Sequence, residues 1–445
     1  MADTAANDAA IKSATRALRP IVVFLMALYL FAVLDRLNVG FAALTMNKDV
    51  GLSPAQFGFG AGLFFLAYVI FEVPSNLFMQ RYGPRRWIAR VVITWGICST
   101  ATALVHSRDS FYLVRILLGL AEAGFFPAVI TYISRGFPAG ERARMNTLFL
   151  LGIPLSGVVA SFLAAGCLAL NGWLGLHGWQ WLFICEGAPP IVLGLVVLRY
   201  LPDDPAKARF LTATQSEALG GLLRHEQATL QRLFPLGTKA ALLSPTTLLL
   251  GLIYFGITVG LSTLGFWLPQ AVSSLAANSP SMVGLLTAIP LAFGAAVMIA
   301  VSYNSDRTGE RVWHFLALSV VASLGWLLFG VLKLPPSARI LLICIASGGT
   351  YGMQGLFWTL PGTYLSGKAA APGIALISAI GTTGAFIGPW VIGHLRQSSG
   401  DFAAAFSFVA ACSIVSGVIG LVVGRRLVRR ASEAARQLSP VIAFD

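Results

Sequence analysis

Twelve stretches of mostly apolar residues divide the chain, and each is about as long as a helix that crosses a bilayer. A bilayer core about 30 Å thick needs about 20 such residues in helical conformation. The stretches lie near 20–42, 57–79, 87–105, 110–134, 143–170, 180–201, 245–269, 281–303, 313–333, 338–361, 370–394 and 402–424. The pattern predicts an all-α membrane protein with twelve transmembrane helices.

The longest polar stretch, 202–242, separates the first six segments from the last six. It predicts two six-helix bundles, 20–201 and 243–428, joined by a cytosolic linker. The polar, mildly basic residues 1–19 and the basic residues 429–445 are expected to be cytosolic tails. We interpret the first of these as a tail and not as a cleaved signal peptide, because it has no separate short apolar region.

An internal repeat supports two related halves. QRYGPRRW (80–87) follows the second segment and DRTGERVW (306–313) follows the eighth, and both contain Arg-x-Gly-x-Arg. A glycine in a short loop permits a tight turn with positive φ. Matching spacing at matching positions favours a duplicated bundle over two unrelated basic turns, so we expect the two bundles to be pseudo-symmetric.

Composition agrees with a lipid environment. Of the 445 residues 56% are hydrophobic and only 11% are charged, whereas a soluble domain averages about 25% charged residues. The net charge of +13 does not indicate nucleic-acid binding, because the basic residues gather in alternate loops. With the N-terminus inside, the outer loops retain few basic residues: Lys48, Arg108, Lys333, Arg339 and Arg396. This asymmetry predicts that both termini are cytoplasmic.

The cysteines offer no sign of a metal or disulfide site. All five lie inside apolar segments, without metal-ligand spacing: Cys98, Cys167, Cys185, Cys344 and Cys412. We interpret them as small buried apolar residues. No catalytic constellation occurs in a polar loop, so we expect neither an enzyme nor a cofactor.

Ionisable residues within the apolar segments carry the functional information. Segment 1 contains Asp35 and Arg36, and segment 4 contains Arg115 and Glu122. Each such charge costs about 2.5–3.5 kcal/mol at a helix centre, so these groups must face one another or a wet cavity. Asp35 and Arg36 are about 100° apart on a helix and need different partners, while Arg115 and Glu122 share a face.

The functional interpretation is that arginine binds an anion and the carboxylates carry protons. A guanidinium group matches a carboxylate with two parallel hydrogen bonds. The alternative, a pair of structural salt bridges between helices, is less favoured because intramembrane charges are usually functional. For Glu72 and Glu186 we favour a structural role, since Glu72 is near a basic loop and Glu186 precedes Pro189 and Pro190.

The second half has no ionisable residue at comparable depth. Its candidates are polar and aromatic, and Trp358 with Gln354 fits a cavity wall. The halves therefore look specialised, because one handles charge and the other shapes the pocket.

Long stretches of the chain resemble the major facilitator superfamily, and within it the anion:cation symporter family, which includes bacterial permeases for tartrate, phthalate and hydroxyphenylacetate. The stretches that carry the resemblance include LDRLNVGFAALTMNKDVGLS (34–53), FFLAYVIFEVPSNL (64–77), RILLGLAEAGFFPAV (115–129), GWQWLFICEG (178–187) and APGIALISAIGTTGAFIGP (371–389).

The resemblance implies proton-coupled import of a small organic anion, a carboxylate such as a hydroxy-diacid, a sugar acid or an aromatic acid. It implies that Arg36 and Arg115 bind substrate and that Asp35 and Glu122 carry protons. A cavity tyrosine and a cavity tryptophan of the family fall on Tyr68 and Trp358, and we expect Gln354 and Ser378 to be further substrate contacts.

The sequence departs from the family at several positions. Gln80 replaces the usual Asp of the first basic loop, whereas Asp306 is kept in the second. Val33, Ser378 and Thr382 stand where relatives often have Tyr or Asn.

Two other functions stay open. The same fold could export a drug with protons, although GIPLSG (152–157) is shorter than the Gly-Pro-rich stretch of such antiporters. The protein could also be a sensor that binds an anion without moving it. For the importer we expect a monomer in the bacterial inner membrane, whose partners are the anion, protons and lipid, with no nucleic acid.

Overall fold

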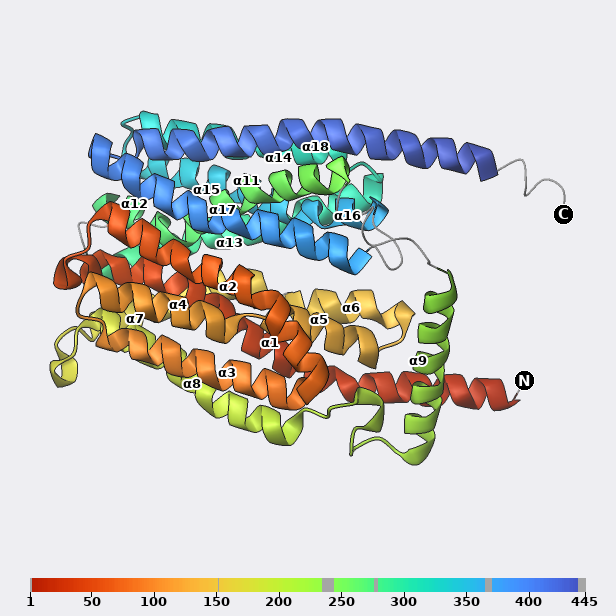
Figure 1. Ribbon diagram of the computed structural model, residues 1–445. Helices are drawn as coiled ribbons and strands as arrows, with labels where there is room; N and C mark the ends of the chain where they lie inside the picture. The colour runs from red at the N-terminus through yellow and green to blue at the C-terminus, as the bar shows by residue number, and fades with distance from the viewer. Residues whose placement is uncertain (1, 151, 234–243, 276–278, 365–369, 439–445) are drawn as a thin grey trace. The chain divides into compact units, whose positions relative to one another are not determined.

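The computed structural model describes residues 2–150, 152–233, 244–275, 279–364 and 370–438, and contains helices but no strand within these ranges (Figure 1). Twelve helical spans among the described residues are long and apolar enough to cross a membrane. Ten of them lie within three residues of the predicted bounds at both ends. The predicted all-α membrane fold with twelve spanning helices is confirmed.

The chain divides into two compact units. The first comprises Met1–Leu233 with Ala276–Ala288, and the second comprises Phe234–Leu275 with Ile289–Asp445. In the first half of the chain the helices are α1 (Ala2–Val50), α2 (Pro54–Tyr82), α3 (Pro84–Ala101), α4 (Arg108–Glu122), α5 (Phe125–Gly136), α6 (Ala139–Leu150), α7 (Gly152–Ala169), α8 (Gly178–Tyr200) and α9 (Ala213–Leu233). In the second half they are α11 (Pro245–Phe266), α12 (Leu268–Val272), α13 (Pro280–Thr308), α14 (Val312–Val331), α15 (Pro336–Phe357), α16 (Thr359–Tyr364), α17 (Ala370–Ser399) and α18 (Ala403–Leu438).

Helix α1 is longer than the apolar pattern predicts. The expected tail before residue 20 is helical and continuous with the first span, because its alanine-rich sequence has high helix propensity. The helix ends before Gly51, whose φ of 74° an L-residue rarely adopts. Polar residues can prolong a helix beyond the membrane, so the length of the apolar segment alone underestimates the length of the helix.

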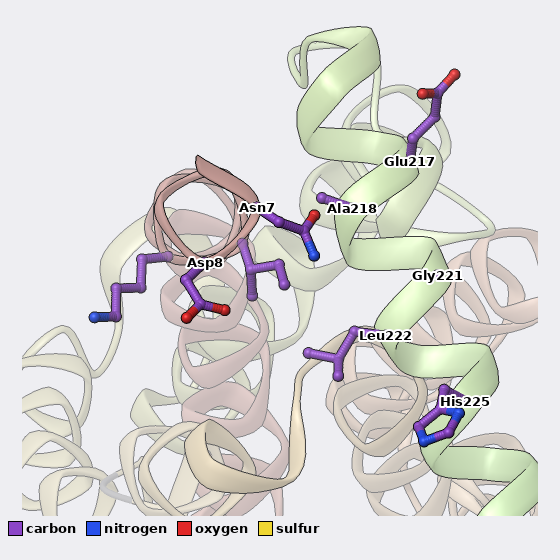
Figure 2. Close-up of a pocket in the computed structure, with 9 residues that line it drawn as sticks. Asn7, Asp8, Glu217, Ala218, Gly221, Leu222 and His225 are labelled. Carbon is purple, nitrogen blue, oxygen red and sulfur yellow. The ribbon is translucent and has the colours of Figure 1, made fainter. Parts of the chain in front are cut away.

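The polar stretch after α8 also contains a helix, α9, which packs against the first part of α1. Gln215 Nε2 donates a hydrogen bond to Ser13 Oγ at 2.9 Å. A surface hollow lies between the two helices, and its lining includes Asp8, Leu222 and His225 (Figure 2). The end of the expected linker, 234–243, lies outside the described residues.

The two repeated basic loops share a turn but differ in their contacts. Gly83 has a φ of 83° and Gly309 one of 69°, as the predicted tight turns require. In the second loop Glu310 accepts backbone hydrogen bonds from Val312 and Trp313 at the start of α14. Slight burial raises the pKa of Glu310, but these bonds outweigh it and lower that pKa overall. The side chains of Gln80 and Asp306 lie outside the description.

Small residues bring the helices close together. A Cβ atom on Gly96 of α3 would lie 2.8 Å from the backbone oxygen of Gly187 on α8. A Cβ on Gly349 of α15 would lie 2.5 Å from the backbone nitrogen of Ala322 on α14. Helices in a bilayer associate through such close packing, since lipid gives no hydrophobic drive between them.

Candidate functional site

An ion pair joins α1 to the end of α4. Arg36 donates from Nε at 2.9 Å and from Nη2 at 2.5 Å to one oxygen of Glu122, Oε1. Glu122 is fully buried, while the Arg36 side chain keeps 24% of its surface exposed. The second oxygen of Glu122, Oε2, has no hydrogen-bond partner. The carboxylate is therefore held by one guanidinium and keeps one free acceptor.

Arg115 is buried without an ion pair. It is 1% exposed, and among the described residues no carboxylate oxygen lies within 4.0 Å of its guanidinium nitrogens. Its Nη2 donates to the backbone oxygen of Ala61 at 3.2 Å, and its Nε has no partner. A buried guanidinium with a free donor is a ready ligand for an anion.

Asp35 points to a different side of α1 from Arg36, as their angular separation predicts. Its Oδ1 accepts hydrogen bonds from Ser99 Oγ at 2.6 Å and from Asn38 Nδ2 at 3.3 Å. Its Oδ2 has no partner. Although Asp35 is only 1% exposed, no arginine neutralises it by direct contact.

An aromatic surface lies beneath the two arginines. The Cζ atom of Arg115 is 4.9 Å from the ring centroid of Phe64, and that of Arg36 is 5.6 Å from the same ring. Arg36 also lies 5.1 Å from the ring of Tyr68. Cation–π attraction favours guanidinium groups over such faces. Phe64 thus links the two cations, and both aromatic residues belong to α2.

A break in the fourth span positions Glu122. Helix α4 ends at Glu122 and α5 begins at Phe125, with Gly124 between them at a φ of 87°. Pro127 has no N–H to bond the carbonyl four residues earlier, which is that of Ala123. Ser75 of α2 donates to this carbonyl at 2.7 Å instead. Gly124 and Pro127 are the sequence signal for the break, which the apolar pattern conceals.

The structure brings five of the predicted site residues together in the first unit: Asp35, Arg36, Tyr68, Arg115 and Glu122. The other three, Gln354, Trp358 and Ser378, belong to the second unit. There Trp358 lies at the junction of α15 and α16, 4.9 Å between ring centroids from Tyr254. The Oε1 atom of Gln354 is buried and has no hydrogen-bond partner.

Several residues near the site could not be identified from the sequence. Ser99 and Ser75 are small hydroxyl residues in apolar segments, Tyr29 resembles any core aromatic, and Tyr254 belongs to a segment without charge. Tyr254 packs so closely on α17 that a Cβ on Gly381 would lie 1.9 Å from its ring. A partial signal exists for Tyr29, which precedes Arg36 by seven residues and so shares its helical face.

The arrangement can bind an anion and exchange protons. Within the described structure Arg115 offers one free donor, Nε, and Asp35 and Glu122 each keep a free carboxylate oxygen. Glu122 would compete with an anion for Arg36. A proton on Glu122 would weaken its hold on Arg36 and leave two cations over the same ring. Within the part of the chain that the structure describes, no group of His, Cys, Asp and Glu residues could hold a metal ion.

Comparison with known proteins places the chain among transporters. The sequence model of the family described as Major Facilitator Superfamily matches residues 25–389. A protein of Agrobacterium vitis named "Putative tartrate transporter" is 43% identical, over 96% of this chain and 98% of that one. The "Quinolone resistance transporter" of Acinetobacter baumannii is 36% identical, over 94% and 96%. A solved bacterial homologue of the human lysosomal transporter Spinster has a TM-score of 0.70 at 18% identity, with 93% and 96% coverage.

Proposed function

This chain belongs to the Major Facilitator Superfamily and is a multi-pass membrane transporter, not an enzyme, and from that premise we propose that it imports a small organic anion together with protons. Arg36 and Arg115 bind the substrate carboxylate, and Asp35 and Glu122 carry the protons. Tyr68 in the first unit and Gln354, Trp358 and Ser378 in the second are the further substrate contacts.

The observation that carries this proposal is the unpaired, buried Arg115. A buried cation without a direct ion pair costs several kcal/mol to desolvate, and Glu122 and Asp35 influence Arg115 only at longer range. That free energy is recovered when an anion with complementary geometry binds. A cationic or neutral substrate would leave the cation unpaired, so the arrangement favours a carboxylate.

Exchange of partners at Arg36 supplies the coupling. In the structure Glu122 holds Arg36. Protonation of Glu122 removes that competition, and a substrate carboxylate then bridges Arg36 and Arg115. Loss of the proton on the other side of the membrane restores the ion pair and displaces the substrate. The return of the empty carrier completes alternating access about a central site.

We propose a hydroxy-diacid, a sugar acid or an aromatic carboxylate as the substrate class. The relative named as a tartrate transporter is similar over nearly the whole chain, and two arginines over one aromatic ring suit a compact acid. The proposal includes a bacterial inner-membrane location, cytoplasmic termini and action as a monomer.

Export of a drug is the second candidate, because a relative of 36% identity carries a name for quinolone resistance. Quinolones also carry a carboxylate, so binding alone does not separate the two functions. The direction of proton-driven flux separates them.

The test begins with thermal unfolding of the purified protein in detergent. Hydroxy-diacids, sugar acids, aromatic carboxylates, a quinolone and cationic drugs are compared at acidic and neutral pH, because a ligand of the native state raises apparent stability by mass action. We expect one anion class to stabilise the wild type more at acidic pH and to have no effect on Arg115→Ala.

Transport assays with liposomes that contain the protein then determine the direction of transport. We expect an inward proton gradient to drive accumulation of the stabilising anion. Accumulation driven by an opposite gradient would establish an exporter. Stabilisation by cationic compounds alone, equal in wild type and Arg115→Ala, would overturn the anion site itself.

A further inference from the structure

A second polar cluster lies behind the arginine site, between α1, α3 and α8. It consists of Asp35 and Asn38 of α1, Ser99 of α3 and Glu186 of α8. Asp35, Asn38, Ser99 and Glu186 are each at most 1% exposed. Glu186 has Asp35 as its charged neighbour and the Asn38 amide beside its carboxyl group. The cluster therefore contains two carboxyl groups in an apolar interior, joined through one amide.

A structural role for Glu186 stays a prediction, but the surroundings of this residue do not favour it. Helix α8 runs without a break through Pro189 and Pro190. Neither Glu186 oxygen accepts a hydrogen bond of ordinary geometry within the described structure. A residue that served only to tie helices together would have satisfied partners, because an orphaned buried polar group costs about 1–3 kcal/mol and more when charged.

The cluster has too many acceptors for its donors. Four buried oxygens have no partner: Asp35 Oδ2, Asn38 Oδ1, Glu186 Oε1 and Glu186 Oε2. The donors are the Ser99 hydroxyl, already given to Asp35, and the Asn38 amide. An ionised carboxylate can only accept, whereas a protonated one also donates. Protonation of either carboxyl group turns one of these unpaired acceptor oxygens into a hydroxyl donor, which can then donate a hydrogen bond to another of the unpaired oxygens.

Helices α3 and α8 pack closely beside this cluster. A Cβ on Gly187, the residue after Glu186, would lie 2.6 Å from Thr100 Oγ1 of α3. One turn earlier on α3, a Cβ on Gly96 would lie 2.8 Å from the backbone oxygen of Gly187. Since there is no room for side chains here, α3 and α8 close over the carboxyl groups. Charge in such a place has little solvent screening.

The ionisable groups around the cluster are few. Asp35 is under the electrostatic influence of Glu122, Arg115 and Arg36. Two ionisable groups from other helices lie near Glu186: Asp35 of α1 and the Cys167 thiol of α7. From α3, the Cys98 thiol lies near Asp35. No arginine is among the neighbours of Glu186, so in the described structure only a bound cation or proton could neutralise it.

We propose that Glu186 and Asp35 form a proton-binding pocket bridged by Asn38, which takes a proton separately from the Arg36–Glu122 pair. The bound proton comes from solvent and returns to it, and no other bond forms or breaks. Its role in coupling rests on the proposed function, because the proton that Asp35 is proposed to carry would be shared with Glu186. Because Asp35 borders both Glu186 and the arginine site, anion binding at Arg115 would change the proton affinity of the pocket.

Infrared spectroscopy of the purified protein tests proton binding without any substrate. A protonated carboxyl group absorbs separately from a carboxylate, and its band shifts in D2O. We expect a pH-dependent carboxyl band that Glu186→Gln removes or moves, while the matched control Glu217→Gln, an exposed glutamate of α9, leaves it unchanged. If Glu186→Gln does not fold, Asn38→Leu, which removes the bridging amide, should shift the band.

A carboxyl spectrum that neither Glu186→Gln nor Asn38→Leu alters would overturn the proposal. So would a band that sodium chloride abolishes at constant pH while potassium chloride does not, since the pocket would then be a sodium site.

Transport by liposomes tests the coupling role separately. With the anion that most stabilises the wild type, we expect Glu186→Gln to retain exchange of labelled for unlabelled anion. Accumulation driven by a proton gradient should fall at least tenfold. Equal loss of both activities would show a structural role and contradict the coupling role. If the wild type itself shows no proton-driven uptake, the proposed function fails, and the infrared result still decides whether Glu186 binds a proton.

Discussion

At the scale of single residues, the two arginines of the first unit differ in what holds them. Arg36 is paired with Glu122 and partly exposed, whereas Arg115 is buried, donates to a backbone carbonyl and lies over an aromatic ring. The sequence alone does not reveal this difference, because both residues are arginines. Arg36 is suited to exchanging partners, and Arg115 is suited to being a fixed anion ligand, because its geometry does not depend on a carboxylate.

Replacing Arg115 with lysine should separate charge from geometry. Lysine retains the positive charge but not the planar fork of donors. We expect Arg115→Lys to fold and to bind the stabilising anion about 10- to 100-fold more weakly, as losing a charged hydrogen bond of about 1.5–3 kcal/mol implies. Anion-dependent thermal unfolding measures the change. The control is Arg108→Lys, an exposed arginine of the same helix, and equal effects of the two variants would contradict a special role for Arg115.

At the scale of elements, the informative feature is the break between α4 and α5. The fourth span is one apolar segment of 29 residues, yet it is two helices. Gly124 adopts a left-handed conformation, and Ser75 of α2 satisfies the carbonyl that Pro127 leaves without a partner. The indole Nε1 of Trp87 in turn donates to Ser75 Oγ at 3.0 Å. The break therefore depends on a contact with another helix, and it leaves Glu122 at a helix end beside Arg36.

Two glycine variants test how tightly this break is packed. Gly124 and Gly172 have nearly equal φ values, 87° and 90°. A Cβ on Gly124 would lie 2.1 Å from Ser75 Oγ, whereas one on Gly172 would meet nothing within 4 Å. Backbone strain of about 1–2 kcal/mol is common to both alanine variants. Overpacking should add about 1–3 kcal/mol to Gly124→Ala alone.

Thermal unfolding in detergent measures the difference between the glycine variants. We expect a clearly lower midpoint for Gly124→Ala than for Gly172→Ala. Equal midpoints would mean that Ser75 moves aside without loss, and that the break is not fixed by its contact with α2.

At the scale of the whole molecule, the distribution of basic residues predicts how the chain crosses the membrane. An even number of spans places both termini on one side, and the excess of Lys and Arg in alternate loops assigns that side to the cytoplasm. The exposed Lys207 between α8 and α9 is then cytoplasmic, and the exposed Asp401 between α17 and α18 is external.

Cysteine labelling of intact cells tests this orientation. In a background without the five native cysteines, we expect a membrane-impermeant maleimide to label Asp401→Cys from outside. Lys207→Cys should react only after the membrane is opened. Both positions are exposed, so accessibility within the fold does not bias the comparison, and the reverse labelling pattern would invert the proposed topology.

The sequence alone determined the spans, and it showed that ionisable residues lie deep in the apolar segments of the first half but not of the second. Apolar length predicts where a helix enters and leaves lipid, and the cost of an intramembrane charge singles out Asp35, Arg36, Arg115 and Glu122 as residues that need partners. The apolar pattern could not predict that α1 includes the polar residues before position 20, because only the residues within lipid need to be apolar.

Only the tertiary structure decided which partners those residues have. Arg36 pairs with Glu122, 86 positions away, and Asp35 bonds Ser99, 64 positions away. Helical periodicity fixes the angle between two side chains on one helix, but not the rotation of that helix against its neighbours. That rotation depends on where glycines let backbones approach, as Gly96 and Gly187 do between α3 and α8. For this reason the unpaired Arg115 and the carboxyl cluster of Asp35 and Glu186 become visible only when the helices are packed.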